Sequence, residues 1–208
     1  MKISQAKNIV QALVSHNIDS SNRGLQLIPM LHSAPGLGKS AIVEQVAEDL
    51  EIECRTIIFA QFDSGELGGF PVLSEDRKQY NRAKPFFMAF EKDSKGILFL
   101  DELPQSPISN QNIAAQLVNE GRIGEHKLPE GWTVVCAGNP MAARAGTNAM
   151  PSHLKDRLTH FDIEPDNSFN EFYNTPMPVI SSSILSVIYN LKINVSNNSS
   201  LRLFNIQH

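Results

Sequence analysis

The chain has 208 residues, of which 41% are hydrophobic, and a formal net charge of −4 at pH 7. This length is enough for one substantial globular domain with an adequate buried core. The acidic balance excludes a chain-wide basic field, so nucleic-acid binding is not indicated. No apolar run approaches the roughly 20 residues that a membrane span needs, and residues 1–6 lack a signal-peptide core, so we expect a cytoplasmic protein.

The first predicted elements are a helix, a strand and a second helix. Apolar residues at helical spacing predict a helix over residues 5–14, and polar turn formers over residues 17–24 end that pattern. The short apolar run 25–31 then predicts a strand buried on both faces. A second helix is predicted between Ala41 and Leu50, where apolar residues again recur at helical spacing.

The segment between that strand and the second helix, residues 32–40, contains two glycines followed by Lys39 and Ser40. It follows the pattern of a phosphate-binding loop, in which backbone N–H groups and a helix N-terminus surround the phosphates. Lys39 would reach the β- and γ-phosphates, and the Ser40 hydroxyl would ligate magnesium. Ser33 stands where the strict pattern has its first glycine, and the alternative is a glycine-rich turn without a ligand. The candidate nucleotide-binding residues are Pro35, Gly36, Leu37, Gly38, Lys39, Ser40 and Ala41.

A further buried strand is predicted over residues 56–60. The order strand, helix, strand predicts an α/β fold with a parallel sheet and helices on its faces. Residues 61–84 are different, because they are rich in glycine and place short apolar segments around the polar turn 74–78, which predicts a solvent-exposed hairpin. Residues 85–90 are predicted to form a helix whose aromatic cluster lies in the core.

Two carboxylates end the next predicted strand, residues 96–100. Because open α/β sheets bind ligands at the carboxyl ends of their strands, this position places Asp101 and Glu102 at a candidate site. There Asp101 is suited to associate with magnesium and Glu102 to activate water. The alternative is a solvated acidic strand end.

The following segment predicts an amphipathic helix that ends near Gly121 and a second hairpin over about residues 121–129. The apolar run 133–137 predicts another buried strand, which carries Asn139 to the same sheet edge as Asp101. An amide at this position could orient water or sense the γ-phosphate. The alternative is an asparagine that stabilises a turn before a proline.

The last predicted elements are a helix that starts at Ser152 and a strand over residues 159–163. Arg157, between them, has a planar guanidinium suited to a developing phosphoryl charge, whereas most surface arginines are solvated or form weak ion pairs. Residues 166–208 are rich in Asn and Ser and contain one apolar stretch. They are expected to be either a small helical appendage or a poorly ordered end.

Taken in order, four motifs resemble those of an AAA+ ATPase of the MoxR-like group: the phosphate loop and residues 98–102, 137–140 and 156–158. The resemblance covers about residues 25–165. It implies a P-loop NTPase (AAA+) core over residues 1–165, with a parallel sheet flanked by helices and with the hairpins as insertions. The MoxR-like part of the resemblance lies in residues 68–71, 120–124, 128–129 and 163–166.

The resemblance also implies a role for each motif. Lys39 and Ser40 belong to Walker A, Asp101 and Glu102 to Walker B, and Asn139 to sensor 1. Arg157 resembles the arginine finger that acts on the nucleotide of a neighbouring subunit. The implied cofactors are ATP and Mg²⁺. Catalytic roles then fall to Glu102, Asn139 and Arg157, and metal ligation to Ser40 and Asp101.

At the level of the whole protein, the resemblance implies an ATP-hydrolysing ring, a hexamer when complete, that remodels or chaperones protein complexes. Its client would be a protein, and a protein with a von Willebrand factor A domain is the expected kind of partner. One departure is that no sensor 2 arginine is recognisable after residue 165, so residues 166–208 would be a partial or degenerate lid.

The incomplete lid keeps open a second hypothesis, an ATP-binding scaffold without significant turnover. A third hypothesis is a DNA-associated motor or loader, which the acidic composition does not favour. With an incomplete lid, we expect the chain alone to be mostly monomeric or weakly associated and to hydrolyse ATP slowly.

Overall fold

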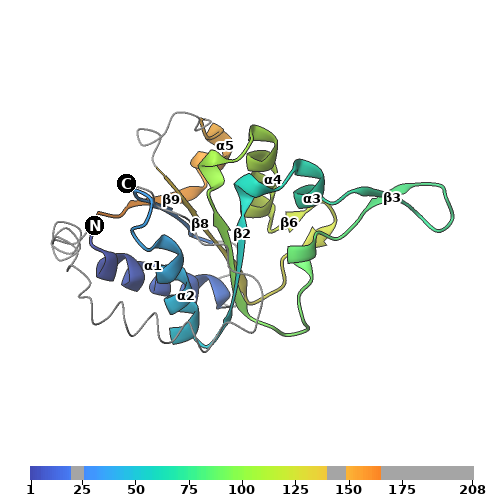
Figure 1. The fold of residues 1–208 in the computed structure, drawn as a ribbon. Coiled ribbons are helices and arrows are strands. Elements are labelled where there is room, and N and C mark those ends of the chain that lie inside the picture. The colour runs from blue at the N-terminus through green and yellow to red at the C-terminus, as the bar shows by residue number, and fades with distance from the viewer. Residues whose placement is uncertain (20–25, 140–148, 165–208) are drawn as a thin grey trace, which may run out of the picture. The chain divides into compact units, whose positions relative to one another are not determined.

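The computed structural model describes residues 1–19, 26–139 and 149–164. At the centre of the described residues is a five-stranded parallel sheet with the strand order β2-β5-β8-β1-β9 (Figure 1). The strands are β1 (Ile28–His32), β2 (Glu53–Ile58), β5 (Gly96–Asp101), β8 (Trp132–Gly138) and β9 (Leu158–Asp162). The α/β fold with a parallel sheet that the sequence predicts is therefore confirmed.

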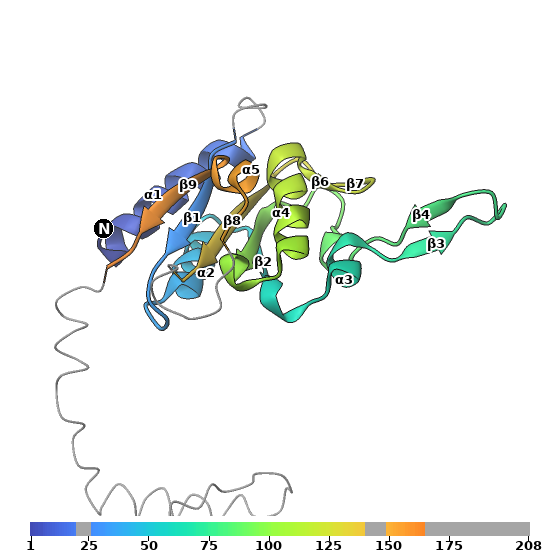
Figure 2. The same cartoon turned by 90° about the horizontal axis from the view of Figure 1, so that it is seen from above.

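Helices cover both faces of this sheet (Figures 1 and 2). On one face α1 (Ile3–Ile18) and α2 (Lys39–Asp49) share a hydrophobic cluster with Ile97 and Phe99 of β5. On the other face α3 (Ser64–Gly68), α4 (Ile108–Glu120) and α5 (Ser152–Lys155) share a second cluster with Leu98 and Leu100. Since successive strand residues point to opposite faces, a strand covered on both sides must be apolar at every position, and β5 is buried from residue 96 to residue 100.

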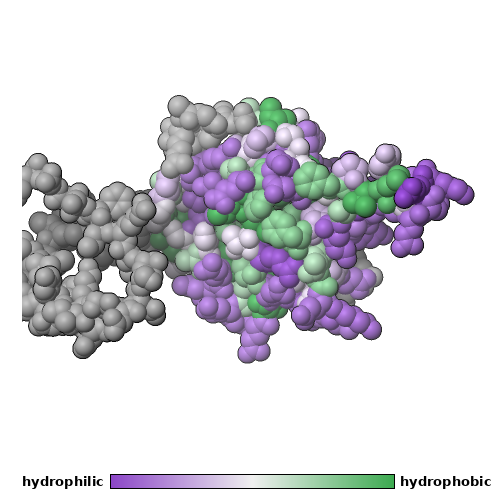
Figure 3. Space-filling model, turned by 45° about the vertical axis from the view of Figure 1, so that its right-hand side comes forward, coloured by the Kyte–Doolittle hydropathy of each residue, from purple (hydrophilic) through white to green (hydrophobic). Residues whose placement is uncertain are grey.

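Two antiparallel hairpins lie outside the sheet, and both were predicted. β3 (Pro71–Leu73) pairs with β4 (Tyr80–Arg82), and β6 (Arg122–Ile123) pairs with β7 (His126–Lys127). The β3–β4 hairpin projects away from the sheet in both ribbon views (Figures 1 and 2). Its apolar side chains are exposed, with Phe70 at 53% and Tyr80 at 74%, and Figure 3 shows hydrophobic surface near its base and hydrophilic surface at its tip.

The helix predicted over residues 85–90 is wrong. The segment forms only the short 3₁₀ helix η3 (Phe86–Met88), because the backbone on either side, at Pro85 and Ala89, has extended dihedral angles. Three consecutive large apolar residues cannot all lie on one face of an α-helix. The turn instead buries Phe87 and Met88 and leaves Phe86 59% exposed.

Other element boundaries differ from the predictions by a few residues. Helix α1 is longer than residues 5–14 at both ends. Strand β1 begins at Ile28, because residues 26 and 27 are described and are not part of the strand. Strand β2 ends at Ile58, where the 3₁₀ helix η2 (Phe59–Gln61) turns the chain out of the sheet. The predicted appendage, residues 166–208, also lies outside the described residues, so the domain boundary at residue 165 stays a prediction.

Among the helices of the described residues, none combines the length and the apolar character that a bilayer span requires.

Candidate nucleotide-binding site

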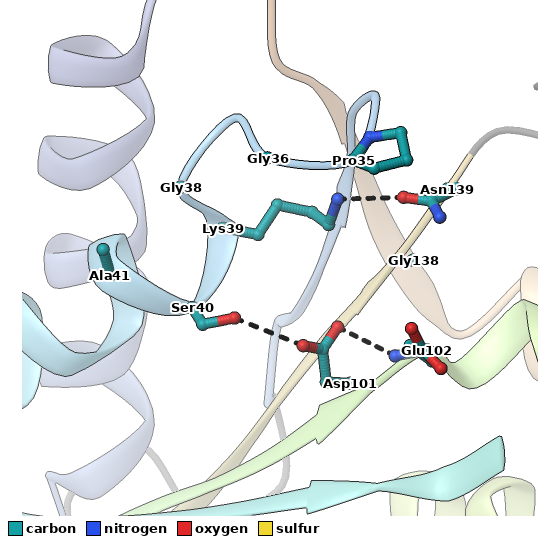
Figure 4. Close-up of a pocket in the computed structure, with 10 residues that line it drawn as sticks. All are labelled: Pro35, Gly36, Gly38, Lys39, Ser40, Ala41, Asp101, Glu102, Gly138 and Asn139. Carbon is teal, nitrogen blue, oxygen red and sulfur yellow. Dashed lines mark hydrogen bonds between the residues drawn. The ribbon is translucent and has the colours of Figure 1, made fainter. Parts of the chain in front are cut away.

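The carboxyl ends of three neighbouring strands, β5, β8 and β1, meet at one pocket of about 360 Å³ (Figure 4). β1 leads into the glycine-rich loop, β5 ends in the acidic pair, and β8 ends beside the predicted asparagine. The structure thus brings together three motifs that are spread over about 100 residues of the chain. The pocket is lined by Pro35, Gly36, Gly38, Lys39, Ser40, Ala41, Asp101, Glu102, Gly138 and Asn139.

Two glycines give the loop its course. Gly36 and Gly38 have φ angles of 81° and 78°, in the left-handed region that residues with a side chain disfavour. An added Cβ would meet no atom within 4 Å at either position, so the backbone conformation and not crowding requires glycine. Gly38 is also the N-cap of α2 and provides no side-chain cap. The first N–H groups of α2, at the positive end of the helix dipole, therefore suit an anion.

The side chain of Lys39 is held inside the loop. Its residue is only 9% exposed, and Nζ donates to Ser33 O (3.2 Å), Ser33 Oγ (3.0 Å), Ala34 O (3.4 Å) and Asn139 Oδ1 (3.0 Å). All four acceptors are neutral. Burial lowers the pKa of Lys39, and the carboxylates of Asp101 and Glu102 oppose this shift. A buried ammonium with neutral acceptors is suited to a phosphate, which would supply the missing negative charge.

Ser33 has a role that the sequence did not reveal. It replaces the first glycine of the strict pattern and is nearly buried, with 3% of its surface exposed. Both its carbonyl and its hydroxyl accept hydrogen bonds from Lys39 Nζ. The serine therefore adds an acceptor that glycine could not offer, and it holds the lysine in the pocket.

Ser40 and Asp101 lie side by side. Ser40 Oγ donates to Asp101 Oδ2 at 3.2 Å. No described residues form a cluster of three or more His, Cys, Asp or Glu that could hold a metal ion. A hydroxyl and one carboxylate fit Mg²⁺ in the manner of phosphate sites, in which protein supplies one or two ligands and phosphate and water supply the others. The pair is thus a suitable half-site for Mg²⁺ bound together with a nucleotide.

Glu102 has an unusual backbone conformation. Its φ of 55° lies in the left-handed region, which costs a residue with a side chain on the order of 1–3 kcal/mol. The backbone is fixed on both sides, since Glu102 N donates to Asp101 Oδ1 at 2.8 Å and Glu102 O accepts from Gln105 N at 3.0 Å. This bend ends β5 sharply and keeps the Glu102 carboxylate at the pocket, where Figure 4 shows it beside Asp101.

Gln105, which the sequence reasoning missed, joins Glu102 to Asn139. It ends the 3₁₀ helix η4 (Leu103–Gln105). Its amide fits its neighbours in one orientation only, in which Nε2 donates to Glu102 O (3.1 Å) and Oε1 accepts from Asn139 N (2.8 Å) and Asn139 Nδ2 (3.2 Å). Its place three residues after Glu102 was the available signal, because a 3₁₀ turn brings residues i and i+3 together.

Two predicted site residues lie outside the pocket. Leu37 is buried and does not line it. Arg157 lies at the opposite edge of the sheet, because Leu158 pairs with Ile28 at the amino end of β1. Its residue is exposed and borders a separate groove of about 350 Å³ with Gln26, Ile28, Val118, Asn119, Glu120 and Gly121. Arg157 therefore does not contribute to the pocket of its own chain.

Residues 29–160 match the model of one protein family, described as the ATPase family associated with various cellular activities, or AAA. This chain belongs to the AAA family. The matched residues run from β1 to β9, so the match contains the glycine-rich loop, the acidic pair, Asn139 and Arg157. No curated protein matches the AAA chain.

Solved structures share the fold at low sequence identity. A candidate ATPase from Cytophaga hutchinsonii is 16% identical, with a TM-score of 0.53, over 90% of this chain and 51% of that one. A mutant of RuvB from Thermotoga maritima is 15% identical, with a TM-score of 0.49, over 76% of this chain and 46% of that one. The AAA chain thus spans about half the length of the solved structures that it matches. The likeness to the Cytophaga protein supports the fold alone.

Proposed function

We propose that this AAA protein binds ATP with Mg²⁺ in the pocket and hydrolyses it to ADP and phosphate. The observation that carries the proposal is the convergence of Lys39, Ser40, Asp101, Glu102 and Asn139 at the carboxyl edge of the sheet. It supplies the groups that phosphoryl transfer requires, namely a phosphate cradle, a cation, magnesium ligands and a base. The family match supports the same activity.

Each residue has a proposed role. The loop N–H groups and Lys39 hold the phosphates, Glu102 accepts the proton of the attacking water, and Asn139 orients that water or the γ-phosphate. Ser40 and Asp101 hold Mg²⁺, which when bound neutralises phosphate charge. Leu37 and Ala41 are proposed to bind the phosphates through their backbone N–H groups, and Pro35, which has no N–H, to shape the wall of the pocket.

We further propose that the protein works as a ring, with Arg157 acting on the nucleotide of the next subunit. The support is its place at the sheet edge opposite the pocket, where it cannot reach the nucleotide of its own chain. A hexameric, MoxR-like remodeller of protein complexes is the fuller proposal, with a partner that carries a von Willebrand factor A domain. The projecting, apolar β3–β4 hairpin supports a protein client. The cytoplasmic location of the protein stays a prediction.

The decisive experiment measures ATP binding and phosphate release by the 208-residue chain and by Lys39→Ala. Loss of the buried ammonium should weaken ATP binding by about 10- to 100-fold, since one charge-assisted contact contributes roughly 1.5–3 kcal/mol. Lys7→Ala, which breaks the surface ion pair with Asp49, is the matched control and should bind ATP normally. Equal affinity of Lys39→Ala and wild type would overturn the site. Binding without phosphate release would instead support a scaffold.

A further inference from the structure

The turn η4 lies between the two motifs that act on the γ-phosphate in the proposed function. It follows Glu102 directly, and it packs against the end of β8, which carries Asn139. A Cβ on Gly138 would lie 2.2 Å from Pro104 Cδ, so only a glycine lets the turn approach the strand this closely. Buried Gln111 of α4 supports the turn from behind, where Nε2 donates to Ser106 O at 3.0 Å. The turn is therefore held from two sides.

Gln105 forms hydrogen bonds in both directions from this turn. Its Oε1 accepts from the backbone N–H and the side-chain Nδ2 of Asn139, and its Nε2 donates to Glu102 O. The Glu102 carbonyl thus receives two bonds from one residue, because Gln105 N also donates to it. That carbonyl belongs to the residue in the left-handed conformation. A change at Asn139 can therefore reach the backbone that sets the direction of the Glu102 side chain.

The chain of contacts continues to the phosphate end of the pocket. Asn139 Oδ1 accepts from Lys39 Nζ, and Asn139 Nδ2 faces Gln105 Oε1. A phosphate that draws Lys39 Nζ toward itself would remove one bond of the Asn139 amide and free that amide to turn. Because hydrogen bonds in a partly buried series polarise and orient one another, the change would pass from Asn139 to Gln105.

We propose that Gln105 is a positioning residue that transmits the state of Lys39 and Asn139 to Glu102. Gln105 is not among the residues that line the pocket, so it is proposed to act through its neighbours. Its hydrogen bonds to Glu102 O keep Glu102 in the bent conformation required for activating water. The strength of these bonds changes with whether Asn139 is hydrogen-bonded to Lys39. This inference rests on the proposed function, because it assigns Gln105 a part in ATP turnover.

Two variants of the 208-residue chain distinguish the contribution of the Gln105 amide oxygen from that of its amide nitrogen. Gln105→Ala removes both ends. Gln105→Glu keeps acceptors for Asn139 but has no donor for Glu102 O at neutral pH. Gln116→Ala is the matched control, since Gln116 Oε1 likewise accepts from a backbone N–H, that of Gly124, at 3.1 Å but away from the pocket.

The first readout is amide hydrogen exchange in ligand-free protein. The Asn139 N–H should exchange about 10-fold faster or more in Gln105→Ala, because it loses its acceptor. It should stay protected in Gln105→Glu and in Gln116→Ala. Unchanged exchange of this amide in a folded Gln105→Ala variant would overturn the inference, whether or not the chain hydrolyses ATP.

The second readout separates binding from turnover. Both Gln105 variants should lower kcat by about 10-fold and leave KM for ATP unchanged, whereas Gln116→Ala should keep both. In a Glu102→Gln background the Gln105 variants should cause no further loss, because the residue acts through Glu102. A wild-type kcat in Gln105→Glu, or a fall in ATP affinity alone, would overturn the role.

A third readout keeps failure of the inference distinct from failure of the proposed function. If wild type binds ATP without releasing phosphate, the hydrolysis proposal fails. The role of Gln105 is then tested by amide exchange over residues 102–106. ATP should change this exchange in wild type and leave it unchanged in Gln105→Ala. An equal change in both proteins would overturn the inference.

Discussion

The two edges of the parallel sheet hold the predicted catalytic residues in different ways. At the carboxyl edge, Lys39 and Asp101 are each joined by hydrogen bonds to other predicted site residues. At the amino edge, Arg157 is exposed in a groove that contains no other predicted site residue. The difference teaches that a site built by one chain can be recognised in that chain's structure, because its residues are joined by hydrogen bonds. An arginine that acts on a neighbour looks, in a single chain, like any solvated arginine.

The largest expected effect concerns the amino edge. Arg157→Ala should lower ATP turnover by on the order of 10³-fold, because an arginine finger stabilises the charge of the transition state. Mixing Arg157→Ala with Lys39→Ala subunits should restore part of the activity, since one mixed interface then has both residues. Phosphate release is measured across mixing ratios. Lys155→Ala, another exposed cation next to β9, serves as control. No recovery at any ratio, with mixed rings shown by mass measurement, would assign Arg157 a structural role.

A smaller effect is expected within the pocket. Glu102→Gln keeps the size of the side chain and removes the base, so turnover should fall by about 10²-fold or more while ATP stays bound. Parallel titrations of ATP binding and phosphate release check this. If Glu102→Gln hydrolysed ATP at the wild-type rate, the carboxyl edge would not hold the catalytic base.

The third prediction tests the close packing of the carboxyl edge. Gly138→Ala would set a methyl group 2.2 Å from Pro104 Cδ, and a proline ring cannot swing aside as a flexible side chain can. Overpacking of this kind costs about 1–3 kcal/mol, so the free energy of unfolding should fall by that amount in a denaturant titration. A variant as stable as wild type would mean that η4 can move away freely.

The smallest expected effect is a change of stability with pH at the end of β1. Burial lowers the pKa of His32, helped by nearby His160 and by the charges of Lys39 and Lys155, while Asp162 opposes the shift. Because the folded pKa is below the ordinary 6.5, the unfolded chain binds the proton more tightly. The stabilising contribution is thus complete above pH 6.5 and is lost as the pH falls through the folded pKa.

Thermal unfolding between about pH 5 and pH 8 measures this effect. The fall in Tm toward low pH should be shallower in His32→Asn than in wild type, and it should be unchanged in His153→Asn, whose residue is exposed on α5. Parallel Tm curves for wild type and His32→Asn would show that His32 does not contribute to the pH dependence.

Much of the pocket could be predicted because its residues follow from strand and loop patterns. An apolar strand that ends in Asp101 and Glu102 must, in a parallel sheet, place both residues at the carboxyl edge, where β1 leads into the glycine-rich loop. The same logic placed Asn139. The bond between Asn139 and Lys39 could not be predicted, because it depends on a side-chain conformation and not on the order of elements.

The failures have a common physical origin. In sequence Ser33 is only a departure from the loop pattern, although its hydroxyl accepts a hydrogen bond from Lys39, and no motif of the sequence includes Gln105. Both act through side-chain hydrogen bonds, Ser33 within the loop and Gln105 between η4 and the residue after β8, and hydrophobic periodicity does not report such bonds. The predicted helix over residues 85–90 failed because an apolar cluster specifies burial but not the backbone that achieves it.

The left-handed backbone of Glu102 sets the stability of the fold against the catalytic role proposed for this residue. A glycine there would adopt φ of 55° without steric cost, at the expense of a more flexible unfolded chain. Selection for thermostability alone would therefore favour losing the acid. On the proposed role of Glu102, directed evolution toward a higher Tm should return chains that are altered at this residue and no longer hydrolyse ATP. With the role proposed for Glu102, a stabilised form of this protein that keeps its activity would have to gain its stability at other positions.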